Sequence, residues 1–179
     1  MTIYALSSGP GISGIAVVRV SGEETSKAIE LLTGKPVPKP RVATLRKINK
    51  INTSELIDEG IILWFPGPES YTGEDMAEIQ VHGSKAVIDA LPSSISNIEN
   101  CRLAEPGEFT KLAFQNGKIN LLKAESIADL ISSKILFGKS SSGKSILAST
   151  CDNIFKSFSL KKLNLSEDFP FIIFIACCL

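Results

Sequence analysis

The sequence is poor in the residue types that build zinc sites, disulfide frameworks and base-stacking surfaces. It has four cysteines, none in a CxxC spacing, and a single histidine, His82. This pattern argues against a metal site and against the cysteine framework of a small secreted domain. The aromatic residues are mostly Phe, with one Trp and two Tyr, so a surface on which single-stranded nucleic acids stack is not indicated.

An excess of charge of one sign and long hydrophobic runs are also missing. Nineteen basic and nineteen acidic residues give no net charge, so binding of nucleic acid through overall charge is not indicated. A local basic patch is compatible with this balance. The N-terminus lacks the basic and apolar regions of a signal peptide. The apolar run at 171–179 is shorter than the roughly 20 residues that span a bilayer. We expect a cytoplasmic protein without a membrane anchor.

Hydrophobic periodicity predicts a mixed α/β fold, a mixed sheet with flanking helices. Runs rich in β-branched residues indicate strands, and apolar residues at helical spacing indicate helices. A helix is expected to start at Pro106 and to end at Gly117, and Asn120 is a plausible N-cap for the next one. After about Lys134 the periodicity weakens, which predicts an irregular tail. The expected strands are 3–6, 15–20, 41–48, 57–65, 75–82 and 101–103, and the other helices are 23–33, 85–91 and 120–131.

Three charged residues stand in segments that are otherwise apolar or rich in glycine. Glu78 lies on the polar face of an alternating strand, where it could accept hydrogen bonds from a flat ligand edge or simply face solvent. Arg19 interrupts an apolar strand, where it could hold an anion or form a salt bridge. Lys118 follows a glycine just before a helix N-terminus, where it could contact an acidic ligand tail or be a solvated turn lysine.

Two further features have both a functional and a plain interpretation. His82 could act as an acid or base, although a lone histidine before a glycine more often serves a turn. The segment GKSSSGKS at 138–145 matches the phosphate-binding loop, with Gly138, Gly143, Lys144 and Ser145 as the nucleotide-contacting residues. No DxxG or NKxD follows it, so the alternative is a chance match in a tail rich in serine and lysine.

A series of motifs in fixed order resembles the N-terminal part of the tRNA modification GTPase family MnmE, also called TrmE. The resemblance covers residues 1 to about 133. The motifs are GIAVVRVSG at 14–22, LWFPGP at 63–68, YTGED at 71–75, VHG at 81–83, PGEF at 106–109, AFQNGK at 113–118 and KAESIADLI at 123–131.

The resemblance implies a domain at 1–118 that binds a tetrahydrofolate derivative, 5-formyl- or methylene-tetrahydrofolate, and forms a homodimer. The family's folate-contacting arginine, glutamate and lysine match Arg19, Glu78 and Lys118. It also implies that 119–133 begins a helical domain. In full-length members a G domain uses GTP, K⁺ and Mg²⁺. With an MnmG-like FAD protein, these members modify C5 of the wobble uridine of tRNA with a carboxymethylaminomethyl-type group.

The sequence departs from the family pattern after Ser133. The family continues into long amphipathic helices, and its phosphate-binding loop lies far downstream, whereas residues 134–179 here form an atypical tail. We therefore expect a truncated or frameshifted copy that does not hydrolyse GTP or modify tRNA by itself. Two alternatives stay open: a remnant without function, and a small nucleotide-binding protein that uses residues 138–145.

Overall fold

The computed structural model describes residues 1–9, 11–53 and 55–132, and it has one mixed sheet with helices on both faces. The element order is β1 (Thr2–Leu6), β2 (Ser13–Ser21), α1 (Thr25–Thr33), β3 (Thr44–Asn49), β4 (Leu56–Phe65), β5 (Met76–Gly83), α2 (Lys85–Ile95), β6 (Cys101–Leu103), α3 (Glu108–Gln115) and α4 (Leu121–Ser132). The mixed α/β class that the sequence predicts is confirmed.

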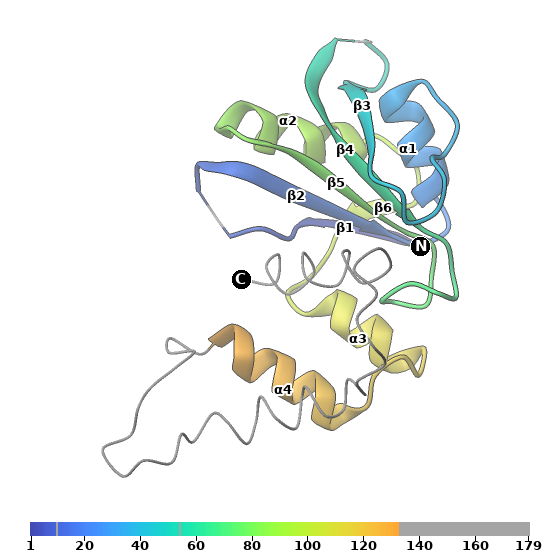
Figure 1. The fold of residues 1–179 in the computed structure, drawn as a ribbon, viewed down its shortest axis with the longest axis vertical. Coiled ribbons are helices and arrows are strands. Elements are labelled where there is room, and N and C mark those ends of the chain that lie inside the picture. The colour runs from blue at the N-terminus through green and yellow to red at the C-terminus, as the bar shows by residue number, and fades with distance from the viewer. Residues whose placement is uncertain (10, 54, 133–179) are drawn as a thin grey trace.

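The sheet has the strand order β3-β4-β5-β2-β1-β6. Neighbouring strands are antiparallel except for the parallel pair β1 and β6. Figure 1 shows α1 and α2 on one side of the sheet and α3 and α4 on the other. The central strands β5 and β2 are therefore covered on both faces, which decides what their alternate side chains meet.

The main core lies between the sheet and the helices α1 and α2. Ile62 and Ile79 from the sheet and Leu32, Leu91 and Ile95 from the helices are fully buried there. Burying one such side chain contributes about 1.5–3 kcal/mol relative to leaving it exposed. A smaller cluster of Leu63, Phe65 and Met76 lies on the opposite face of the sheet. This second cluster forms the apolar base of the candidate site.

Several predicted boundaries are wrong, and three of them have a local reason. The strand expected from Arg41 begins only at Thr44, because Arg41 has a left-handed backbone with φ 61°. Helix α2 continues past Pro92 to Ile95, where it buries an additional apolar side chain. Helix α3 begins at Glu108 rather than Pro106, after Gly107 in the left-handed conformation at φ 77°.

Other local predictions are confirmed. Helix α1 ends at Gly34, which adopts φ 65° and donates its backbone N–H to the Glu30 carbonyl. Asn120 caps α4, since its Oδ1 accepts the Lys123 backbone N–H at 2.9 Å. Gly34 thus marks the start of the connection that leads from α1 to β3, and Asn120 marks the end of the connection between α3 and α4.

Candidate functional site

Arg19 and Glu78 form a buried ion pair at the centre of the sheet. They lie directly opposite each other on β2 and β5. The Arg19 Nη2 and Nε atoms donate to Glu78 Oε1 at 2.7 and 3.2 Å. Each residue is only 3% exposed. A buried charge is tolerated when it is paired and hydrogen-bonded. The structure therefore shows Arg19 in a salt bridge, one of the two roles expected from the sequence. Glu78 does not face solvent.

Strand alternation explains why the pair points away from the main core. Val18 and Val20 on β2 pack into that core, and so do Ala77 and Ile79 on β5. The residues between them, Arg19 and Glu78, must face the other side of the sheet. On that side α3 covers them.

Helix α3 contributes an aromatic ring over the ion pair. The Arg19 guanidinium carbon lies 5.7 Å from the centroid of the Phe109 ring, within the range of a cation–π contact. The Tyr71 hydroxyl and Thr110 Oγ1 are 3.2 Å apart. The loop between β4 and β5 is thereby joined to α3 beside the pair.

A hollow of about 260 Å³ opens next to the pair, between the end of β4, the start of β5, the loop between them and the α3–α4 connection. Glu78 and Lys118 both line it. Its apolar wall comes from Phe65, Met76 and Ile119, all of them buried. Flat apolar walls with a few polar groups are the usual features of a small-molecule site.

Lys118 is held in place by the loop before β5. Gly73 has φ +82°, and a Cβ built on it would lie 3.2 Å from Asn116 Cβ and 3.4 Å from Lys118 Cγ. The Asn116 Nδ2 atom donates to the Thr72 carbonyl at 2.7 Å. The stem of Lys118 therefore lies against Gly73. Among the residues that the structure describes, its ammonium makes no ion pair or side-chain hydrogen bond.

The charges around the hollow favour an anion. Arg41, Lys118 and Lys123 line it, and so do the carboxylates of Glu69 and Glu78. Because Arg19 compensates the charge of Glu78, cations outnumber the remaining carboxylate. A ligand with a hydrogen-bonding ring and an acidic tail matches this arrangement.

The structure brings together the three residues that the sequence singled out. Glu78 and Lys118 share the hollow, and Arg19 reaches it through its contact with Glu78. Neither Arg41 nor Phe109 stands out as a site residue in the sequence. Arg41 is expected in a strand, yet its guanidinium donates to the Glu69 carbonyl and lies 5.9 Å from the Phe65 ring centroid. No local pattern indicates either contact.

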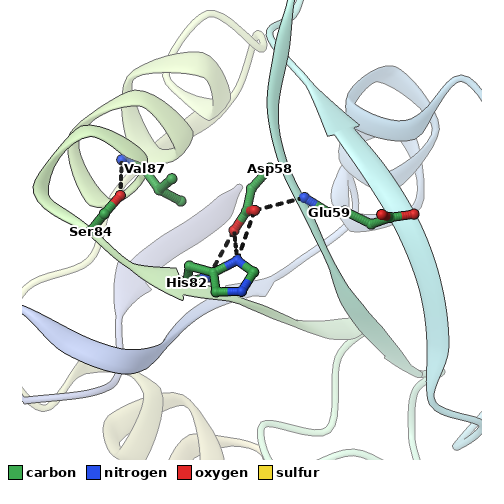
Figure 2. A network of polar contacts seen from close by, with 5 residues as sticks. All are labelled: Asp58, Glu59, His82, Ser84 and Val87. Atoms are coloured by element: carbon green, nitrogen blue, oxygen red, sulfur yellow. Dashed lines mark hydrogen bonds and ion pairs between the residues drawn. The ribbon is translucent and has the colours of Figure 1, made fainter.

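His82 lies apart from the hollow, near the N-terminus of α2 (Figure 2). Its Nδ1 is 2.9 Å from Asp58 Oδ1, and its backbone N–H donates to Asp58 Oδ2 at 2.7 Å. Burial alone would raise the pKa of Asp58. Hydrogen bonds from the His82 backbone, the His82 ring and the Glu59 backbone outweigh that effect and hold the pKa below its ordinary value. The contact joins β4 to β5.

The remaining sequence-based candidates have different outcomes. Gly138, Gly143, Lys144 and Ser145 lie outside the described residues, as does the tail at 134–179. In the part of the chain that the structure describes, no group of His, Cys, Asp and Glu side chains could hold a metal ion. None of the helices in that part is long and apolar enough to cross a bilayer.

Comparisons with known proteins agree on one family. The family model described as "GTP-binding protein TrmE N-terminus" matches residues 2–118. The chain is 83% identical over 134 residues to "tRNA modification GTPase MnmE" of Pelagibacter ubique (strain HTCC1062), a match that covers 75% of this chain and 30% of the relative. The protein of the same name from Sinorhizobium medicae (strain WSM419) is 50% identical over 133 residues, or 74% of this chain and 30% of the relative.

A eukaryotic relative matches the same region. The Danio rerio protein "5-taurinomethyluridine-[tRNA] synthase subunit GTPB3, mitochondrial" is 49% identical over 130 residues, which is 73% of this chain and 26% of the relative. The matches to these three relatives span at most 30% of their lengths.

Proposed function

This chain belongs to the TrmE N-terminal family, and we infer its function from that membership together with the geometry of the hollow. We propose that residues 1–118 form a domain that binds a tetrahydrofolate one-carbon donor in the hollow between Glu78 and Lys118. Residues 119–133, which contain the whole of α4, would begin the helical domain that follows in the family. The single observation that carries the proposal is that Glu78 and Lys118 line one hollow and that Arg19 holds Glu78 there.

The chemistry of the hollow suits the two ends of such a ligand. A pterin ring presents a flat edge of N–H groups, and a buried carboxylate such as that of Glu78 can accept hydrogen bonds from them. Phe65 and Met76 offer apolar contact to the ring faces. The glutamate tail carries carboxylates, for which Lys118 and Arg41 are suitable partners. Arg19 would act as a positioning residue that fixes the Glu78 carboxylate.

The wider activity is also a proposal, because the chain covers less than a third of its curated relatives. We propose that the bound folate supplies the one-carbon unit for C5 modification, of carboxymethylaminomethyl type, of wobble uridine in tRNA. The proposed partners are a second copy of the N-terminal domain and an MnmG-like FAD protein. GTP, K⁺ and Mg²⁺ would be used only by full-length members. Sedimentation equilibrium of the full chain tests the homodimer, for which twice the chain mass is expected.

Titration calorimetry of the full chain with 5-formyltetrahydrofolate tests folate binding. We expect saturable binding by the natural sequence and a loss of about tenfold or more in affinity for Lys118→Ala, since a charge-assisted contact contributes about 1.5–3 kcal/mol. Lys118 is exposed, so its truncation should leave the fold intact. The matched control is Lys85→Ala on α2, a helix that packs in the main core on the other face of the sheet.

The outcome separates this proposal from a remnant without function. A folded chain that gives no heat with the folate contradicts the proposal and favours the remnant. Equal affinities for the natural chain and Lys118→Ala would show that the folate binds away from the hollow.

A further inference from the structure

A basic segment without acidic residues leads away from the hollow. Residues 31–54 contain no Asp or Glu, although the whole chain has equal numbers of acidic and basic residues. Their basic residues are Lys35, Lys39, Arg41, Arg46, Lys47 and Lys50. Charge is thus balanced over the chain and concentrated locally, which is the kind of patch that a small polyanion recognises.

Arg41 belongs to both this segment and the hollow. Its backbone N–H donates to the Trp64 carbonyl at 2.8 Å, at the end of β4, and its side chain lines the hollow beside Phe65. Lys39 precedes it by two residues, and the Val42 N–H returns to the Lys39 carbonyl at 3.3 Å. The part of the segment from Lys35 to Arg41 therefore ends at the wall of the hollow.

The segment before β3 is held on the body of the domain. Pro36, Pro38 and Pro40 alternate along it, and each fixes its own backbone φ. Pro38 is buried, and Val37 packs against the main core. The Arg46 Nη1 atom donates to the Pro36 carbonyl at 2.6 Å. Lysines carried by such a fixed segment lose less backbone entropy when they meet a ligand than lysines on a free loop.

The charges along this segment are available to a ligand. Lys35 and Lys39 are exposed, and neither makes an ion pair with any residue of the described ranges. Lys47, by contrast, stands opposite Glu59, and Lys50 pairs with Glu55. We define the tail strip as Arg41, Lys39 and Lys35.

We propose that the tail strip binds the oligoglutamate extension of the ligand, so that the protein prefers folates with several γ-linked glutamates over the monoglutamate. The inference rests on the proposed folate site. At about 260 Å³ the hollow is at or below the roughly 300–1,000 Å³ of sites that enclose a whole ligand, so the tail must leave it. Each added γ-linked glutamate carries one more carboxylate, ionised at neutral pH, and the strip supplies cations where the tail emerges.

A nucleic-acid backbone is the competing partner for a basic strip. The observations favour the oligoglutamate, because Arg41 at one end of the strip lines the hollow and the whole chain has no net charge. A surface that binds a nucleic acid usually has a broad excess of basic residues.

The test compares 5-formyltetrahydrofolate as monoglutamate and as pentaglutamate, titrated into the full chain at low salt. The natural sequence is expected to bind the pentaglutamate about fivefold more tightly, since each exposed ion pair raises affinity only modestly and the strip offers three cations. This advantage should shrink as salt is added. In Lys35→Glu/Lys39→Glu the advantage should disappear while the monoglutamate affinity stays unchanged. Lys85→Glu, a charge reversal on α2, should keep it.

Each result decides the matter. Equal affinities for the two folates, or an advantage that survives in Lys35→Glu/Lys39→Glu, overturns the tail strip but leaves the proposed folate site standing. No binding of either folate contradicts the proposed function and the strip together. If Lys35→Glu/Lys39→Glu weakens the binding of tRNA and leaves the preference for the pentaglutamate intact, the strip contacts nucleic acid and the proposal is wrong.

Discussion

At the scale of single residues, the site depends on two charges that would be costly to bury separately. Glu78 and Arg19 are 3% exposed and meet at 2.7 Å. Removing one partner leaves the other charge buried without compensation, which is the costly case for a buried pair. Replacing both by apolar side chains removes that cost. Fold stability and ligand binding can therefore be separated by mutation.

We predict that Glu78→Ala lowers the free energy of unfolding by about 3–5 kcal/mol, because the Arg19 charge then stays buried without the carboxylate that compensates it. The free energy of unfolding of the double variant Arg19→Met/Glu78→Leu should be within about 1 kcal/mol of that of the natural sequence, or above it. The double variant should not bind folate, because it lacks the Glu78 carboxylate. Urea denaturation measures the first effect and calorimetry the second. A double variant that is as unstable as Glu78→Ala would contradict this account of the pair.

The sequence shows these residues as candidates but not as partners. Arg19 stands out because it interrupts a run of valines, and Glu78 because it alternates with buried side chains. Nothing local states that the two strands are neighbours. The pairing spans 59 positions along the chain, and only the strand order places β2 beside β5. The family resemblance selects the same residues without supplying the contact between them.

At the scale of elements, the loop between β4 and β5 positions the lysine of the hollow. Gly73 is left-handed at φ +82°, and Asn116 Cβ and Lys118 Cγ approach the place where a side chain would begin. The sequence shows the glycine within the motif YTGED. It does not show that this turn packs against the end of α3, because that contact depends on how α3 lies on the sheet.

We predict that Gly73→Ala destabilises the protein by about 1–2 kcal/mol through backbone strain alone. The added methyl group should also displace the stem of Lys118 and weaken folate binding. Urea denaturation and calorimetry on one preparation measure both effects. Gly34→Ala is the matched control, since Gly34 is also left-handed at φ +65° but has no atom within 4 Å of the added methyl group. Gly34→Ala should lower the free energy of unfolding and leave the affinity for folate unchanged.

A second element-scale contact joins the ends of β4 and β5. The Asp58 carboxylate accepts the backbone N–H of His82 at 2.7 Å and that of Glu59 at 2.8 Å. The paired register of these two strands ends at Ile61 and Gln80, so Asp58 bridges the strands beyond their last backbone pair (Figure 2). The sequence offers no sign of this bridge, because the two residues lie on different strands.

The Asp58 bridge predicts a pH dependence of stability. Its pKa is lower in the folded protein than in the unfolded chain, where it is about 3.9. Its contribution is therefore fully present above about pH 4 and is lost as the pH falls through the folded value. Asp58→Asn should cost about 1–2 kcal/mol at pH 7, and the gap to the natural sequence should narrow below pH 4. A gap that is constant with pH, measured by thermal unfolding, would contradict the bridge.

At the scale of the whole molecule, one sheet serves two purposes. Its face toward α1 and α2 carries the main core. The ion pair and the hollow belong to the other face, the side on which Figure 1 shows α3. The sequence indicates the class of fold, because the periods of its strands and helices alternate clearly. The relative placement of the layers comes from long-range packing, which a local pattern does not encode.

The most direct test is a crystal structure of the full chain grown with 5-formyltetrahydrofolate. We expect the pterin ring in the hollow with its N–H edge on Glu78, and the glutamate tail directed toward Lys118 and Arg41. Folate bound at another surface, with the hollow unchanged and Glu78 still contacting only protein atoms, would contradict the account.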